Sequence, residues 1–298
     1  MERSGVELPA LFIAADAASQ DGQKRTKRTV AIQLGLLVLA AAAGAVPTRL
    51  SLGIAPGSLV GGAAFAVALI IGATYTQGRA YQRWYRGRAA AESVKTLTWR
   101  YAVGGAPFPK NTKEKQDDEK EAREIFLHRL AQLVDELQEI DLPPAPGHEQ
   151  ITGWMRQVRS SDLTSRMETY RVHRVEDQRD WYARRSHQHA RGANRWAAVV
   201  AGGSVAGVLA AASHGFGMWE FNLLGVAAAV SAAATAWLQF QQHRTLRVSY
   251  AVAEHELSMA LSRLPGRDDE EDWSTFVGDV EGAISREHTL WVGRRKLD

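Results

Sequence analysis

Four stretches of the chain contain no Lys, Arg, Asp or Glu and consist mostly of apolar and small residues. A helix needs about 20 residues to cross a hydrocarbon layer about 30 Å thick, and each stretch is long enough. Because the stretches form two pairs with short connections, the pattern predicts two helical hairpins in a membrane. A soluble protein with four buried helices is the alternative, but such helices rarely run about 20 residues without a charge. The stretches are residues 29–48, 50–78, 196–219 and 221–242.

The pattern predicts an all-α membrane protein with four transmembrane helices and long helices that extend into the cytoplasm. We expect a continuous helix over residues 79–101, a helix over 163–195 that continues into the third membrane helix, and a final helix near 273–292. Apolar residues, Val134 among them, recur at helical spacing over 125–140 and predict an amphipathic helix. The expected segments are an N-terminal segment 1–28, a first hairpin 29–78, a helical region 79–195, a second hairpin 196–242 and C-terminal helices 243–298.

Positive charge gathers at the outer ends of both hairpins, whereas Arg49 is the only basic residue in the predicted tips. Basic residues beside membrane helices favour the cytoplasmic side, so we expect both termini and the central region in the cytoplasm. Some of these arginines could also bind anionic lipid headgroups, although a solvated helix face is the usual use of a charged run. The arginines expected near headgroups are Arg79, Arg83, Arg191, Arg195 and Arg244.

Small residues four positions apart recur in the apolar stretches, as at Ala40 and Gly44 or Gly203 and Gly207. Helices in lipid associate by close packing at small residues, because burial of apolar surface gives little driving force there. The spacing fits self-assembly into an oligomer and equally fits packing inside one copy. The sequence leaves both interpretations open.

The chain carries no recognisable catalytic or metal-binding pattern. It has no cysteine, which excludes disulfides and thiolate chemistry, and no phosphate-binding loop, dinucleotide fingerprint or nucleophile elbow. His187 and His189 have no evident carboxylate partner for a zinc site. The net charge of +3 is small and locally concentrated. We therefore expect neither enzyme activity nor a metal, a cofactor or nucleic acid.

No ionisable residue lies in the middle of a predicted membrane helix, which argues against an ion-coupled transporter. A pore is compatible with this pattern, because small polar and apolar side chains can line one. Hydroxyl groups in membrane helices also bond back to their own helix, which is the alternative use of Ser and Thr here. The pore-lining candidates are Gln33, Ser204, Ser231 and Thr235.

Two motifs of aromatic and charged residues lie beside the hairpins. The first is ESVKTLTWRY over residues 92–101, followed by Ala106-Pro107-Phe108. The second consists of Tyr170, Arg174, Gln178, Trp181 and Tyr182, followed by Asn194. Together with a tail that runs from Ile284 to Trp291, they resemble the SLATT family, the SMODS and SLOG-associating two-transmembrane effectors. Two tandem modules of that family would cover almost the whole chain.

The resemblance implies a bacterial inner-membrane effector of conflict or antiphage systems that forms an oligomeric pore, with about four copies expected. The signal would reach the pore through the cytoplasmic helices, as a nucleotide second messenger or as a protein partner. A membrane scaffold or sensor that recruits a partner without conducting is the alternative. In this interpretation the residues that fix helix packing and assembly are Glu92, Lys95, Trp99, Tyr101, Trp181 and Tyr182.

Overall fold

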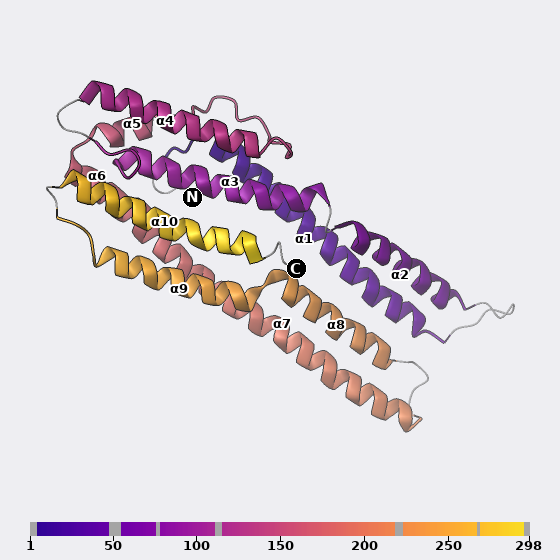
Figure 1. The fold of residues 1–298 in the computed structure, drawn as a ribbon. Coiled ribbons are helices and arrows are strands. Elements are labelled where there is room, and N and C mark those ends of the chain that lie inside the picture. The colour runs from indigo at the N-terminus through magenta and orange to yellow at the C-terminus, as the bar shows by residue number, and fades with distance from the viewer. Residues whose placement is uncertain are drawn as a thin grey trace. The chain divides into compact units, whose positions relative to one another are not determined.

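The computed structural model describes residues 5–47, 55–75, 78–110, 115–217, 223–266 and 269–294. Within these ranges every regular element is a helix, which confirms the all-α prediction (Figure 1). In chain order the elements are α1 (Ala10–Gly44), α2 (Pro56–Tyr75), α3 (Arg79–Val103), α4 (Lys115–Glu136), α5 (Gly153–Ser160), α6 (Leu163–Tyr170), the π-helix η1 (Arg171–Glu176), α7 (Asp177–Gly215), α8 (Leu223–Gln241), α9 (His243–Leu261) and α10 (Glu270–Arg294).

Among the described residues, four helical runs are long and apolar enough to cross a membrane, as the uncharged stretches predict. Figure 1 shows α1 with α2 as one antiparallel hairpin and α7 with α8 as the other. Helices suit this setting because they satisfy their own backbone hydrogen bonds where water is absent. The two predicted tips, including Arg49, lie largely outside the described residues, at 48–54 and 218–222.

The chain divides into two compact units, each of which combines segments distant in sequence. The polar unit consists of Met1–Gln23, Gln82–Arg185 and Ser249–Asp298, and the membrane unit consists of Lys24–Tyr81 and Ser186–Val248. The two predicted hairpins fall within the membrane unit. Helices α1, α3, α7 and α9 each contribute residues to both units.

Aromatic rings form much of the core of the polar unit. Trp99 of α3 meets Trp154 and Tyr170 edge-on, with ring centroids 5.0 and 5.9 Å away. Tyr170 in turn meets Trp273 of α10 at 5.6 Å. Edge-to-face contacts of this kind add about 0.5–1.5 kcal/mol beyond burial of the rings. The rings therefore join α3, α5, α6 and α10 into one core.

The amphipathic helix predicted over 125–140 is α4, but its limits differ. α4 begins within the charged stretch, which contains no Pro or Gly to stop it, and ends at Glu136. Leu137 follows in a turn and is still buried. The prediction that Val134 belongs to the buried apolar stripe is wrong, because Val134 is 44% exposed. The buried face of this segment contains Phe126 and Leu137.

The helix predicted to continue from residue 163 into the third membrane helix is unbroken from Leu163 to Gly215, and it contains one π turn, η1. α6 begins after Asp162, whose carboxylate accepts a hydrogen bond from the backbone nitrogen of Ser165 at 2.9 Å. The short side chain of Asp162 thus caps a nitrogen that has no partner inside the helix. A π turn alters the helical repeat by one residue and often occurs at functional sites. This directs attention to the side chains of η1.

Candidate functional site

Arg174 of η1 forms a buried ion pair with Glu281 of α10. Arg174 Nη2 lies 2.6 Å from Glu281 Oε2, and Arg174 Nε donates to Oε1 at 2.7 Å. Tyr170 donates its hydroxyl to the same Oε1 at 3.0 Å. The side chains of Arg174 and Glu281 are 2% and 0% exposed, so these charge-assisted bonds form away from water, where they are strong. The π turn is thereby tied to α10.

Arg166 of α6 holds the C-terminal end of α3. Its Nη1 donates to the carbonyl of Val103 at 2.8 Å, and the indole nitrogen of Trp273 donates to the same carbonyl at 2.8 Å. The last carbonyls of a helix have no partner within the helix, so these two donors satisfy one of them. Arg166 also forms an ion pair with Glu270 of α10.

Arg159 of α5 bonds the same end of α3 and the loop that follows it. Its Nη1 donates to the carbonyls of Tyr101 at 2.8 Å and Phe108 at 3.1 Å. Its Nε donates to Glu119 of α4 at 2.8 Å. Buried side chains from one short segment thus connect α3, α4 and α10. We call Arg159, Arg166 and Arg174 the arginine core.

The arginine core and its carboxylates perturb nearby titrating groups. Burial alone would lower the pKa of Arg174, but the charge and hydrogen bonds of Glu281 outweigh burial and raise the pKa. Burial, followed by Glu281, raises the pKa of Tyr170 well above its usual value. Burial, followed by Glu119, raises the pKa of Tyr101 to about 12. Both phenols and the arginine therefore keep their protons at neutral pH.

The predicted assembly residues of α3 make contacts within one copy. Lys95 Nζ lies 3.4 Å from Glu92 Oε2. Burial lowers the pKa of Lys95, and the charge of Glu92 partly offsets this shift. Trp99 and Tyr101 are each 2% exposed. Their rings have almost no surface for a second copy, so they can influence assembly only through the fold of the polar unit.

Trp181 and Tyr182 of α7 form a second aromatic cluster with Tyr250 of α9. Their ring centroids lie 5.4 and 5.7 Å from that of Tyr250. The guanidinium of Arg185 lies 5.3 Å from the centre of the Trp181 ring, a cation–π contact. The cluster fastens α7 to α9 within the polar unit, next to the residues at which both helices pass into the membrane unit.

In the first hairpin, Gln33, Ala40 and Gly44 face α2. A Cβ added at Gly61 of α2 would lie 2.8 Å from the carbonyl of Ala40 and 3.5 Å from the nitrogen of Gly44. A Cβ added at Gly72 would collide with the amide of Gln33. The close approach of these helices depends on small residues. These contacts favour the interpretation in which Ala40 and Gly44 allow close packing between two helices of the same copy.

In the second hairpin, Gly203 and Gly207 of α7 face α8. A Cβ added at Gly203 would collide with the hydroxyl of Ser231, and one added at Gly207 would lie 3.5 Å from the Cβ of Ala227. Ser231 Oγ is buried and has no hydrogen-bond partner among the described residues. Ser231 therefore occupies the contact between the two helices of its own hairpin.

Ser204 and Thr235 direct their hydroxyls to their own helices. Ser204 Oγ donates to the carbonyl of Val200 at 2.9 Å, and Thr235 Oγ1 donates to the carbonyl of Ser231 at 2.9 Å. This back-bonding is the alternative that the sequence leaves open for such residues. Both hydroxyl hydrogens are used within one copy, and a role in lining a pore stays a prediction.

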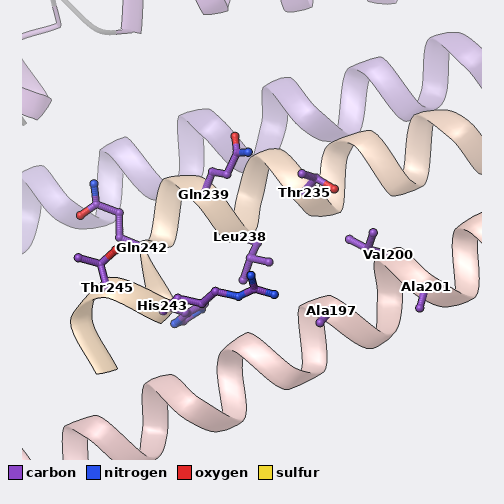
Figure 2. Close-up of a pocket in the computed structure, with 10 residues that line it drawn as sticks. Ala197, Val200, Ala201, Thr235, Leu238, Gln239, Gln242, His243 and Thr245 are labelled. Atoms are coloured by element: carbon purple, nitrogen blue, oxygen red, sulfur yellow. The ribbon is translucent and has the colours of Figure 1, made fainter. Parts of the chain in front are cut away.

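A cavity of about 580 Å³ lies between α7 and the junction of α8 with α9 (Figure 2). Thr235 lies on its wall, and Gln239, Gln242 and His243 contribute polar atoms. Gln242 has a φ of 50°, which is uncommon for a residue with a side chain, and it stands between the two helices. The cavity thus coincides with a break in the helical run.

His189 contacts His243, not the nearby His187. The Nδ1 atoms of His189 and His243 lie 2.9 Å apart, a bond in which one ring donates and the other accepts. His187 is exposed. Within the part of the chain that the structure describes, no three His, Asp or Glu residues form a group suited to a metal ion.

The arginines predicted to meet lipid headgroups differ in their surroundings. Arg83 lies 3.6 Å from Asp21 and 3.7 Å from Asp141, and its side chain is 20% exposed. Protein carboxylates therefore surround Arg83. The other four, Arg79, Arg191, Arg195 and Arg244, are exposed.

The sequence motifs contain Arg174 but give no indication of Arg159, Arg166 or Glu281. A charged residue on a polar helix is normally solvated, so nothing local distinguishes these side chains. The three arginines recur seven and eight residues apart, but α5 ends at Ser160 and α6 begins at Leu163, so this spacing is not that of one helix face.

Two family matches lie in tandem along the chain. Residues 9–167 match the SMODS and SLOG-associating 2TM effector domain 3, and residues 170–291 match the SMODS and SLOG-associating 2TM effector domain 1. The chain belongs to the SLATT family. The matches confirm the two tandem SLATT modules that the motifs indicate. No curated protein and no solved structure matches the chain.

The two SLATT modules do not coincide with the two compact units. Each module supplies one hairpin to the membrane unit and further helices to the polar unit. Arg166 of the first module pairs with Glu270 of the second, and Trp273 of the second bonds Val103 of the first. The SLATT modules therefore share one polar core.

Proposed function

We propose that this SLATT protein is an oligomeric, pore-forming effector of a bacterial conflict or antiphage system, gated through its cytoplasmic helices. Two observations support the proposal: membership of a family of two-transmembrane effectors, and four runs among the described residues that are long and apolar enough to span a membrane. The positive charges at the outer ends of both hairpins support an inner-membrane location with both termini in the cytoplasm.

The observation that carries the gating proposal is the continuity of helices between the two units. α1 passes from the polar unit to the membrane unit after Gln23, and α7 does so after Arg185. Neither helix is interrupted there, and a helix transmits rotation or translation along its axis because its backbone is hydrogen-bonded at every turn. In this proposal a change in the polar unit passes to the membrane helices through these continuous segments.

A conduction path in this proposal lies between copies. Gln33 and Ser231 contact the partner helix of their own hairpin, and Ser204 and Thr235 bond their own helices. One copy thus uses its polar membrane side chains internally. A closed ring of about four copies would place the membrane helices around a central axis.

The gating signal in this proposal is a cytoplasmic one, either a nucleotide second messenger or a protein partner. The protein acts without enzymatic turnover, metal or cofactor, and membrane lipid and further copies of the chain are its other partners. Nucleic acid is not among them.

The same internal use of polar side chains favours a second candidate, a non-conducting scaffold or sensor that recruits a partner. Here the helices α1 and α7 would carry a signal in the opposite direction or anchor the polar unit. The two functions differ in ion flux.

Potassium efflux from vesicles that contain the reconstituted protein tests the proposal. We expect efflux when the cytoplasmic signal is present, and loss of efflux in Gly203→Leu, which forces α7 away from α8. Gly202→Leu is the matched control, because a Cβ there meets nothing within 4 Å. Efflux that is absent both from vesicles and from cells challenged to trigger the system would support the scaffold.

A further inference from the structure

A cavity of about 380 Å³ opens between α3, α4 and α10 of the polar unit. This volume lies within the range of about 300–1,000 Å³ that is typical of small-molecule sites. Its lining residues all belong to the polar unit, and none of the three arginines of the arginine core is among them. None of the contacts described above explains it.

Two helices turn one polar face each toward this cavity. α3 presents Ser93, Thr96 and Arg100, and α4 presents Arg129 and Gln132, while one leucine of each helix adds apolar lining. The spacing of three and four residues is that of a single helix face. These α3 residues belong to the ESVKTLTWRY motif. Their polar groups line the open cavity and do not pack in the core.

Arg100 supplies a donor that is only partly satisfied. Its Nη2 donates to the carbonyl of Gly278 at 2.9 Å, which fixes the guanidinium at the cavity wall. Its Nε is buried and has no hydrogen-bond partner among the described residues. A buried donor without an acceptor costs free energy, so an acceptor oxygen in the cavity would be stabilised there. Gly282 and Ser285 keep the α10 wall free of bulk.

Arg129 adds a second guanidinium to the cavity. Its side chain is exposed and forms no hydrogen bond or ion pair with the other described side chains. Glu136 lies at the cavity as well, so the lining carries two positive charges and one negative charge. The hydroxyls of Ser93 and Thr96 provide further donors, and so does the amide of Gln132, whose Nε2 also lies 3.2 Å from His128 Nε2. The combined chemistry favours a small anion that has several acceptor oxygens.

We infer that this cavity binds a small phosphate-bearing ligand between Arg100 and Arg129. Guanidinium groups pair with phosphate oxygens through two parallel hydrogen bonds, and the surrounding hydroxyls can bond the remaining oxygens. A soluble nucleotide and a lipid headgroup share this phosphate chemistry. The inference concerns binding and does not depend on the pore proposed above.

Titration calorimetry of the full chain in a neutral detergent tests the inference, with adenosine monophosphate and inorganic pyrophosphate as soluble probes. A short-chain phosphatidylglycerol serves as the lipid probe. Arg100→Gln and Arg129→Gln each remove one guanidinium. Arg123→Gln is the matched control, because it removes an exposed arginine of the same helix α4 that does not line the cavity.

We expect saturable binding of a soluble probe that weakens by about tenfold or more in either cavity variant and is unchanged in Arg123→Gln. If phosphatidylglycerol binds saturably, weakens in the same way in Arg129→Gln, and the two soluble probes do not bind, the site is supported and its ligand is a lipid headgroup. Absence of saturable binding by all three probes overturns the inference. Equal weakening in Arg123→Gln and Arg129→Gln also overturns it, because binding would then reflect diffuse charge. Arg129 is exposed, so its variant decides the test even where Arg100→Gln fails to fold.

Discussion

Replacing Arg174 with Met removes the cation of the buried ion pair while keeping a side chain of similar reach. Glu281 is 0% exposed, so the variant leaves a carboxylate inside the polar unit without its positive partner. Removal of one member of a buried pair costs about 3–5 kcal/mol, because the remaining charge has lost its hydration. For a unit of about 150–250 residues, each kcal/mol lowers the unfolding midpoint by about 2–4 °C. The midpoint should therefore fall by about 6–20 °C.

Tryptophan fluorescence of the full chain during heating in detergent measures this loss. Trp273 is fully buried, and its ring lies 5.6 Å from that of Tyr170, so its emission reports on the affected core. Arg171→Met is the matched control, since Arg171 pairs with Glu168 at the surface, where a pair is worth at most about 1 kcal/mol.

A double variant, Arg174→Met with Glu281→Leu, should recover most of the lost stability, because neither charge is then left buried. If Arg174→Met unfolds at the same temperature as Arg171→Met, the ion pair does not hold η1 to α10. Failure of the double variant to recover would show that the shape of the pair matters more than its charge.

Single substitutions at Gly61, Tyr101 and Trp99 test other contacts of the two units. Gly61→Ala should lower the unfolding midpoint of the membrane unit, because the added Cβ would lie 2.8 Å from the Ala40 carbonyl. Gly62→Ala should leave the midpoint unchanged, because its Cβ would meet nothing within 4 Å. Equal midpoints for the two variants would contradict the close packing of α1 and α2. The folded-state pKa of Tyr101, about 12, lies above its unfolded value of about 10, so the stability it contributes is present below pH 10 and is lost as the pH rises to about 12. Tyr101→Phe should lose less stability over that window in melts recorded against pH, and identical slopes would refute this. Trp99→Ala should destabilise the polar unit by about 3–5 kcal/mol in the same fluorescence assay, and an unchanged midpoint would show that its ring is not part of the core.

The membrane hairpins could be predicted from the sequence because lipid imposes one strong condition. A charge-free stretch such as 29–48 must be helical in hydrocarbon, since every backbone group has to be bonded internally. The start of α1 at Ala10 could not be predicted in this way. Its first turns lie in the polar unit, where packing rather than lipid decides the structure.

The arginine core could not be predicted because its partners are distant in the chain. Arg166 bonds Val103, and it pairs with Glu270, 104 residues away. No local pattern distinguishes such an arginine from a solvated one. The family motif does contain Arg174, although it does not reveal that the partner is Glu281.

The small residues of the hairpins show a different limit. The spacing of Gly203 and Gly207 predicts close packing, and the structure places both against α8. Spacing alone does not identify the helix that packs there. A helix of the same copy and a helix of a neighbouring copy both require small residues for close approach. The sequence likewise does not show whether the four pore-lining candidates make contacts within one copy or line a path between copies.

The native mass of the detergent-extracted complex decides whether a pore can lie between copies, because such a pore requires a closed ring. We expect a uniform assembly of about four or more copies, whose symmetry provides a central axis. A stable monomer or dimer would contradict it, since too few helices would then surround a conduction path.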